Sequence, residues 1–314
     1  MLAKHEVDLH GHTNRSDGND TPMEFVFHAK ERGMKVCAIT DHDVVPPKTV
    51  VVDGVERDIQ EWAKNDLGID LMLGIEVSCE TWIDDTHLVC FGCDWDDPFF
   101  KELDEFTIKS KVNSYKKLAD ALTERGMPVA WEEVLDNDGH PVPEEQVQKK
   151  MLFELMARKG YFESWSDAKL YVKEARDMII KREKPDAITV IKEAHRTGGY
   201  VIMAHPFLVT EPVTFQGKII TRSVFIEKLI EAGLDGIEAS YTYDKTSYFG
   251  TMTKDEIKKA VIQYWGDRLF ISGGSDYHAD AKKGVKNPRD IGDCGISVEE
   301  FMANKRLVDM LYKG

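Results

Sequence analysis

Short apolar runs recur along the chain and are separated by amphipathic segments. The runs are four to six residues long and rich in aliphatic side chains, as at residues 6–9, 35–40, 71–75, 87–92, 200–204, 234–239 and 269–272. Such runs are typical of buried strands, and the segments between several of them have the apolar spacing of helices, as at residues 22–32, 187–196, 222–232 and 254–264. Strands that alternate with helices predict an α/β fold built on a parallel sheet or barrel.

The middle of the chain breaks this alternation. Between residues 98 and 185, strand candidates nearly vanish and long helical patterns dominate, over residues 106–125, 146–159 and 166–182. We therefore predict that residues 1–97 form the first part of an α/β domain, that residues 98–185 form a helical insertion, and that residues 186–314 complete the α/β domain.

Charge and composition exclude several classes of partner. The 314 residues include 56 acidic and 41 basic side chains, a formal net charge of −15. A field of this sign repels polyanions, so we expect no binding of long nucleic acid or of anionic membranes. No apolar run approaches the ~20 residues of a membrane helix, and the first residues lack the apolar stretch of a signal peptide. Five cysteines in such a chain are typical of reduced thiols, and we expect a cytoplasmic protein.

Histidines and carboxylates gather where the predicted strands end. The first strand runs into His10-Gly11-His12, whose imidazoles project to the same side of an extended chain. The carboxyl ends of parallel barrel strands face one common mouth. We therefore expect one cluster of nine side chains, made of His10, His12, Asp17, His42, Glu76, His87, His205, Asp276 and His278.

Each of these residues taken singly is also typical of a turn or of a hydrogen-bonded surface position. The prediction depends on their convergence, because so many donors in one mouth need cations as partners. Imidazole and carboxylate ligands without thiolates suit manganese, iron or zinc. We therefore infer that the protein binds two or three divalent metal ions.

The same residues stand in motifs of a known family. The motifs are His10-Gly11-His12, Asp17-Gly18, Thr40-Asp41-His42-Asp43, Gly74-Ile75-Glu76, Ala204-His205-Pro206 and Gly274-Ser275-Asp276-Tyr277-His278. They resemble those of the PHP (polymerase and histidinol phosphatase) phosphoesterases. This resemblance implies the PHP fold, a distorted (βα)7 TIM-like barrel with a metal cluster at its mouth, here with an inserted helical subdomain. It also implies three metal sites, formed by His10, His12, Glu76 and Asp276, by Glu76, His87 and His205, and by Asp17, His42 and His278.

The helical insertion resembles that of one branch of this family, which includes nucleoside 3′,5′-bisphosphate phosphatases and 5′-to-3′ exoribonucleases. The resemblance implies that the insertion closes over the nucleotide. It places Lys149 where the branch has an arginine that helps bind substrate, so Lys149 would meet a phosphate as a point charge, and Met151 stands where the branch has a histidine. We also predict that Arg15, in the turn that carries Asp17, binds substrate.

These observations lead to a functional hypothesis. We expect the protein to hydrolyse a phosphomonoester of a small nucleotide, either a nucleoside 3′,5′-bisphosphate or a short 5′-phosphorylated oligonucleotide, by metal-activated hydroxide. The leaving group would take its proton from a metal-bound water, from His205 or from Asp276, and the last two are the candidate catalytic residues. Histidinol-phosphate phosphatase, a metal-dependent amidohydrolase and a metal-dependent binding module remain as alternatives. The insertion speaks against the first, and the presence of Glu76 instead of a carboxylated lysine speaks against the second.

Overall fold

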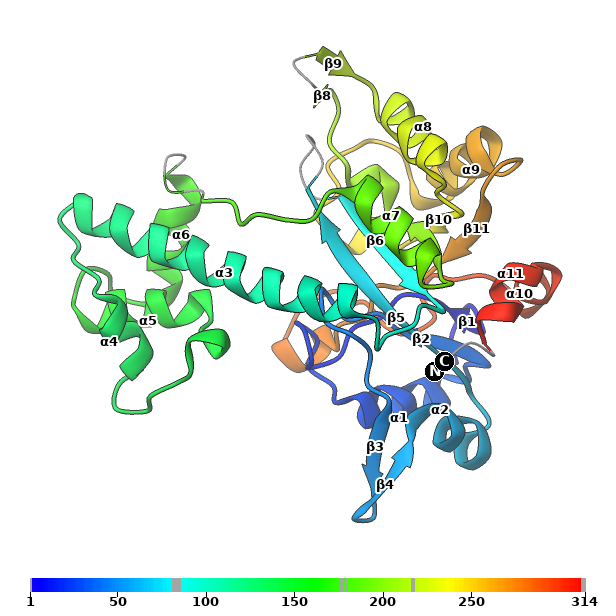
Figure 1. The fold of residues 1–314 in the computed structure, drawn as a ribbon, viewed down its shortest axis with the longest axis horizontal. Coiled ribbons are helices and arrows are strands. Elements are labelled where there is room, and N and C mark those ends of the chain that lie inside the picture. Colours follow the sequence, from blue (N-terminus) through cyan, green and yellow to red (C-terminus); the bar gives the residue numbers. More distant parts are fainter. Residues whose placement is uncertain (1, 81–85, 176–177, 179, 216–217, 312–314) are drawn as a thin grey trace. The chain divides into compact units, whose positions relative to one another are not determined.

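A computed structural model describes residues 2–80, 86–175, 178, 180–215 and 218–311 (Figure 1). The chain divides into two compact units. One unit comprises Met1–Lys101 and Pro185–Gly314, and we call it the barrel unit; the other comprises Glu102–Lys184, and we call it the helical unit. No helix in the described part of the chain has both the length and the apolar character needed to cross a membrane.

Seven strands form the main sheet of the barrel unit, in the order β1–β2–β5–β6–β7–β10–β11. Each overlaps one of the seven apolar runs of the sequence, and β5 extends four residues beyond its run. Their bounds are β1 (Val7–Asp8), β2 (Val36–Ile39), β5 (Asp70–Cys79), β6 (Thr86–Phe91), β7 (Tyr200–Met203), β10 (Gly236–Ser240) and β11 (Phe270–Gly273).

The expectation of an all-parallel sheet is wrong for one strand. β6 runs antiparallel to both β5 and β7, whereas all other neighbouring strands are parallel. Only six residues, 80–85, separate β5 from β6. A parallel return requires a crossover of about a dozen residues or more, so this connection permits only a hairpin.

The sheet curves into a nearly closed barrel. Its two outer strands, β1 and β11, meet at their carboxyl ends. Leu9 donates its backbone N–H to the Gly273 carbonyl at 3.1 Å, and Asp276 donates its backbone N–H to the His10 carbonyl at 3.0 Å. These bonds bring the segment after β1 against the segment after β11. Two segments that carry predicted metal ligands, from opposite ends of the sequence, therefore lie side by side.

The strands of the barrel are buried on both faces. In β2, Ala38 packs in one apolar cluster with Phe301 and Leu307, whereas its neighbour Ile39 packs in a second cluster with Phe25. Successive side chains of a strand point to opposite faces, which explains why these strands are apolar without alternation. The C-terminal helices and the first helix thus cover opposite sides of β2.

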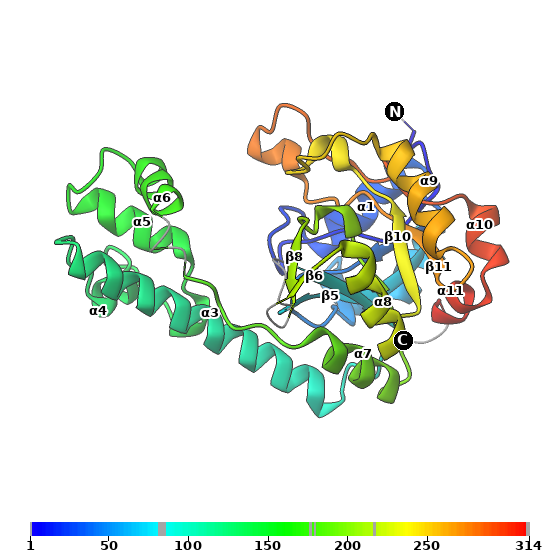
Figure 2. The same ribbon diagram turned by 90° about the horizontal axis from the view of Figure 1, so that it is seen from above.

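Helices lie around the outside of this sheet (Figure 2). The helix α1 illustrates how the sequence sets their ends: Thr21 and Glu24 form a capping box at its start, and Gly33 ends it with a φ of 81°. The four helices expected in this unit are confirmed to within one residue. The bounds are α1 (Pro22–Arg32), α2 (Ile59–Trp62), α7 (Ala187–Arg196), α8 (Arg222–Ala232), α9 (Lys254–Trp265), α10 (Val298–Ala303) and α11 (Lys305–Met310).

Two small hairpins were not predicted. The first pairs β3 (Thr49–Val52) with β4 (Val55–Asp58), and the second pairs β8 (Val213–Phe215) with β9 (Lys218–Ile220). In the first, Asp53 and Gly54 form the turn with φ values of 51° and 79°. Two successive residues with positive φ are what a tight two-residue hairpin requires.

The helical unit is built around an apolar core of its own. Leu118 and Leu122 of α3 pack with Leu152 and Met156 of α5, and all four are at most 1% exposed. The helix expected over residues 166–182 ends at Glu174, and residues 176, 177 and 179 lie outside the described residues. The bounds are α3 (Pro98–Glu124), which begins in the barrel unit, α4 (Trp131–Asp136), α5 (Lys149–Arg158) and α6 (Trp165–Glu174).

Candidate metal centre

The structure brings the nine predicted donors together at one end of the barrel. Most of them follow the carboxyl ends of parallel strands, as expected. Glu76 was expected just after its strand but lies within β5, because that strand continues to Cys79. His87 is different, because it lies near the beginning of β6. Since β6 is antiparallel, its beginning reaches the same end of the barrel, and Ser78 of β5 pairs with His87. The direction of β6 therefore delivers this histidine to the cluster.

Glu76 lies at the centre of the cluster and is fully buried. Its two carboxylate oxygens face five imidazole nitrogens at distances of 3.0, 3.1 or 3.2 Å. The nitrogens beside Oε2 belong to His10, His12 and His42, and those beside Oε1 belong to His87 and His205. A single carboxylate thus joins histidines from four different segments of the chain.

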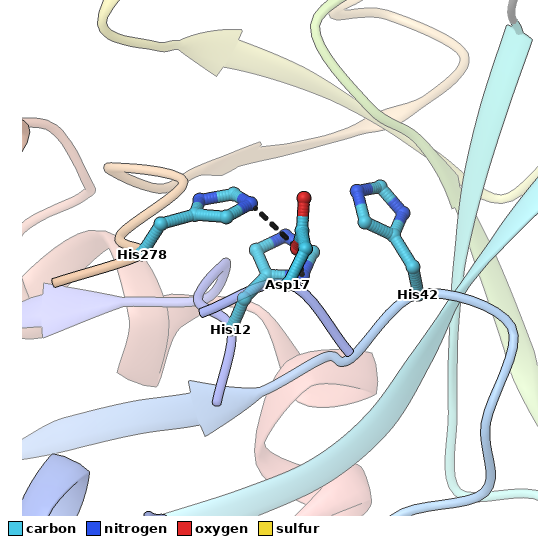
Figure 3. Close-up of side chains that lie close together, drawn as sticks. All are labelled: His12, Asp17, His42 and His278. Carbon is cyan, nitrogen blue, oxygen red and sulfur yellow. Dashed lines mark ion pairs between the residues drawn. The ribbon is translucent and has the colours of Figure 1, made fainter. Parts of the chain in front are cut away.

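Three groups of donor atoms are compact enough to bind an ion. Within each group, all donor atoms lie within 4.8 Å of one another. The first group is His10, His12, Glu76 and Asp276. The second is His42, Glu76 and His87, and the third is His12, Asp17, His42 and His278. Figure 3 shows the last group, in which Asp17 lies between His278 and His42. The first group has the composition expected from the sequence.

The other two groups differ from the expected sets. His42 takes the place expected for His205 beside Glu76 and His87, and His12 joins the third group. His205 nevertheless belongs to the cluster, because its Nε2 lies 3.0 Å from Glu76 Oε1. Asp17 is the outermost member: its side chain is 59% exposed, and its Oδ1 lies 3.0 Å from His278 Nε2.

Several buried polar atoms of the cluster have no hydrogen-bond partner of acceptable geometry among the described residues. These atoms are His10 Nε2, His12 Nδ1 and Nε2, His42 Nδ1 and Glu76 Oε2. Buried polar groups are almost always hydrogen-bonded, so this concentration of unpartnered ligand atoms in one place needs an explanation. Imidazole nitrogens and carboxylate oxygens around a common centre fit divalent cations, and the residues present therefore fit a metal centre.

The electrostatics of the cluster also favour the binding of cations. Burial opposes protonation of His12, but the carboxylates of Asp276 and Glu76 outweigh it and raise the pKa of His12 to about 9. Burial lowers the pKa of His42 to about 4. Burial also opposes ionisation of Glu76, yet the imidazoles around it hold the pKa of Glu76 well below its usual range. The negative charge of the centre thus attracts protons and cations, which compete for the same ring nitrogens.

Residues outside the predicted set orient some of the predicted ligands. Glu238 of β10 contacts His10 Nδ1 at 3.2 Å, which leaves His10 Nε2 directed at Glu76. Tyr241 donates its hydroxyl to Asp276 Oδ2 at 2.7 Å, and Arg289 donates to the same oxygen at 2.5 Å. The signal for Glu238 was present in the sequence as an acidic residue inside an apolar strand. No local pattern marks Tyr241 or Arg289.

The backbone is strained at several of these positions. His205 has a φ of 27° and Asp276 a φ of 54°, in the left-handed region that non-glycine residues rarely adopt. Gly274 lies so close to the segment after β1 that an added Cβ would stand 2.3 Å from His10 Cβ. Strain and close approach of this kind are concentrated at functional sites, where the surrounding fold holds the geometry.

The cluster opens into a cavity of about 320 Å³. Arg289 and Lys245 provide positive charge in its wall, where they pair with Asp276 and Asp293 respectively. Arg15, predicted to bind substrate, is not one of the side chains that line this cavity, because its guanidinium donates to the Val45 carbonyl at 3.0 Å.

Lys149, the other predicted substrate-binding residue, belongs to the helical unit. It is the first residue of α5, and its ammonium lies 6.0 Å from the centre of the Phe153 ring. Burial lowers the pKa of Lys149. Within its own unit this side chain therefore places its ammonium over an aromatic ring, as in a cation–π contact.

Comparison with known proteins identifies the family. A model of the PHP domain matches residues 8–195, which is more than half of the chain. The chain belongs to the PHP domain family. The match includes the first six predicted ligands of the PHP domain, and His205, Asp276 and His278 follow beyond it.

Relatives of this PHP protein cover nearly its whole length. It is 26% identical over 276 residues to the 5′-3′ exoribonuclease of Haemophilus influenzae, with 87% of this chain and 90% of the relative covered. It is 24% identical over 304 residues to the 3′,5′-nucleoside bisphosphate phosphatase of Chromobacterium violaceum, with 91% and 90% covered.

A solved structure shares the fold. A metal-dependent phosphoesterase from Bifidobacterium adolescentis matches with a TM-score of 0.66 and 21% identity, over 100% of this chain and 98% of the other. This structure confirms the predicted PHP barrel. The family match and the two relatives confirm the predicted class of enzyme, a metal-dependent phosphoesterase.

Proposed function

We propose that this protein hydrolyses a phosphomonoester of a small nucleotide, either a nucleoside 3′,5′-bisphosphate or a short 5′-phosphorylated oligonucleotide. The observation that carries the proposal is Glu76, a fully buried carboxylate that faces five imidazole nitrogens at 3.0 to 3.2 Å. The names of the two relatives described above support nucleotides as the class of substrate. The net charge of −15 favours small substrates over long nucleic acid.

The nine donors, His10, His12, Asp17, His42, Glu76, His87, His205, Asp276 and His278, would hold two or three divalent ions, of manganese, iron or zinc. When bound, such ions would activate water and neutralise charge on the phosphate oxygens. The two carboxylate oxygens of Asp276 make different contacts. Oδ2 is held by Tyr241 and Arg289, so that Oδ1 faces His12 Nε2 at 3.0 Å.

His205 and Asp276 are our candidates for protonating the leaving group. Both line the cavity, and both are nearly buried, at 6% and 7% exposed. The side chains of Arg289 and Lys245 in the same wall would add positive charge beside the substrate phosphate. Lys149 of the helical unit is proposed to contribute a further phosphate contact, to be measured as a rise in KM in Lys149→Ala.

The test is a comparison of phosphate release at a single manganese concentration. The substrates are adenosine 3′,5′-bisphosphate, histidinol phosphate and a 5′-phosphorylated RNA trimer, and an amide and nucleobase panel addresses the amidohydrolase alternative. We expect release from a nucleotide substrate, loss of release after chelation, and a loss of about 10³-fold or more in Asp276→Ala.

His140→Ala is the matched control, because this histidine is exposed and lies in the helical unit. It should retain the wild-type rate. Preferred turnover of histidinol phosphate or of an amide would overturn the proposal, and a folded Asp276→Ala protein with full activity would overturn the assignment of the site.

A further inference from the structure

A second cavity adjoins the metal-centre cavity in the barrel unit. It has a volume of about 430 Å³ and lies between the segment after β7 and the loop before α9. Leu208 and Ser247 line both cavities. A ligand bound at the metal centre can therefore extend into this second space without leaving the surface of the barrel unit.

A row of aromatic rings leads from the metal centre to the second cavity. The ring of His205 lies 5.0 Å from that of Tyr241, which lies 4.8 Å from that of Tyr243, which in turn lies 5.3 Å from that of Tyr248. Tyr241 and Tyr243 are buried, and Tyr248 lines the second cavity. The rings connect a proposed metal ligand to the wall of the cavity by direct packing.

The wall of the second cavity is aromatic and held in place. Phe207 packs under the guanidinium of Arg222, whose carbon lies 4.2 Å from the ring centre. Arg222 is fixed by donating its side chain to the Val209 carbonyl at 3.1 Å. A Cβ added to Gly250 would stand 2.0 Å from the Tyr248 hydroxyl, so the backbone packs directly on that ring.

Phe249 differs from the buried aromatic side chains beside it. It lines the cavity, and 95% of it is exposed. A phenylalanine ring in water forgoes the free energy that its burial would provide. Thr210, Ser247 and Thr251 add hydroxyl groups around the same cavity. Aromatic faces with polar groups at the rim match a flat heteroaromatic ring, which stacks on its faces and hydrogen-bonds at its edge.

We propose that this second cavity is the subsite for the nucleobase of the substrate, with Phe249 as its stacking platform. The inference rests on the proposed function, because it assumes that the phosphate of a nucleotide binds at the metal centre. Stacking does not depend on the identity of the base, so the subsite would accept several nucleobases and distinguish nucleotides from base-free sugar phosphates.

The test compares two ligands that differ only in the base. Adenosine 5′-monophosphate and ribose 5-phosphate are titrated by calorimetry into the manganese-loaded protein, and are also used as competitive inhibitors of phosphate release. The wild type should bind the nucleotide more tightly. Phe249→Ala should weaken nucleotide binding about five- to a hundredfold and leave ribose 5-phosphate binding unchanged, and Phe249→Trp should restore it.

Tyr264→Ala is the matched control, because this tyrosine of α9 is 62% exposed and is not among the side chains that line the cavity. It should bind both ligands as the wild type does. Equal affinity of the wild type for the two ligands would overturn the subsite, and so would an equal effect of Phe249→Ala on both. A change in oligomeric state with unchanged nucleotide affinity would show instead that Phe249 serves self-association. Absence of phosphate release would overturn the proposed function alone, since the calorimetric comparison still decides the subsite.

Discussion

Glu238 links two proposed metal ligands, His10 and His205, through its two carboxylate oxygens. Oε1 lies 3.2 Å from His10 Nδ1, and Oε2 accepts the backbone N–H of His205 at 2.7 Å. One carboxylate on β10 thus sets the ring orientation of one imidazole and the backbone of another. Carboxylates in this position fix the tautomer of a metal-binding histidine and increase its basicity.

Replacing this carboxylate should weaken the metal centre without unfolding the protein. We expect Glu238→Gln to lower manganese affinity about 10- to 100-fold, since the amide preserves the shape of the side chain but not its charge. Isothermal titration with manganese measures the change. Glu227→Gln removes an exposed carboxylate that pairs with Arg268, and it should bind manganese as the wild type does. Equal affinities of Glu238→Gln and wild type would show that Glu238 does not position His10.

Gly274 should tolerate no side chain. In Gly274→Ala the added Cβ would stand 2.3 Å from His10 Cβ and 2.7 Å from His10 N, so β1 and β11 would have to separate. We expect a loss of about 2–4 kcal/mol in the free energy of unfolding, together with weaker manganese binding. Gly68→Ala is the control: Gly68 has a φ of 73° and its nearest contact is at 3.9 Å. It should lose only about 1 kcal/mol. Similar losses in both variants would contradict the role of close approach.

The pair formed by His28 and Asp290 should make stability depend on pH. The two side chains contact at 2.7 Å, and this hydrogen bond raises the pKa of His28 above 6.5 against the effect of burial. A raised pKa in the folded state means that the stabilisation is complete below the unfolded value and is lost as the pH rises through the folded one. His28→Gln should therefore lower Tm more at about pH 6 than at about pH 9. A difference in Tm that does not change with pH would contradict this account.

A substitution in the core of the helical unit should lower the stability of that unit. Leu152 is fully buried there, so Leu152→Ala should destabilise the helical unit by about 2–5 kcal/mol. Manganese affinity should stay at the wild-type value, because every proposed ligand belongs to the barrel unit. Hydrogen exchange resolved by residue, combined with manganese titration, measures both effects. Loss of manganese binding in the folded variant would contradict the separation of the two units.

The sequence predicts the strands well, because burial on both faces is a local property, and it also picks out nine donors that the structure brings close together. The apolar run at residues 200–204 became β7, and His205 at its end joined the cluster. The direction of β6 could not be inferred from its pattern, since an apolar run reads the same in either direction. The six-residue connection before it carried that information.

Partners that depend on tertiary structure could not be predicted. Tyr241 and Arg289 meet Asp276 from segments 35 and 13 residues away along the chain, and nothing in their neighbourhoods indicates this contact. The grouping of the ligands was also beyond the sequence: whether His42 or His205 accompanies His87 depends on ring positions, and strand order alone does not set them. Asp53-Gly54, in contrast, is a hairpin signal that the sequence already contained.

The helical unit contributes none of the nine proposed donors and has a core that the barrel unit does not share. Substitutions can accumulate between residues 102 and 184 while the chemistry of the cation cluster is conserved. Such a division means that the sequence of the helical unit can vary without altering the surroundings of the nine proposed donors. Homologous chains of this architecture should therefore diverge fastest between residues 102 and 184.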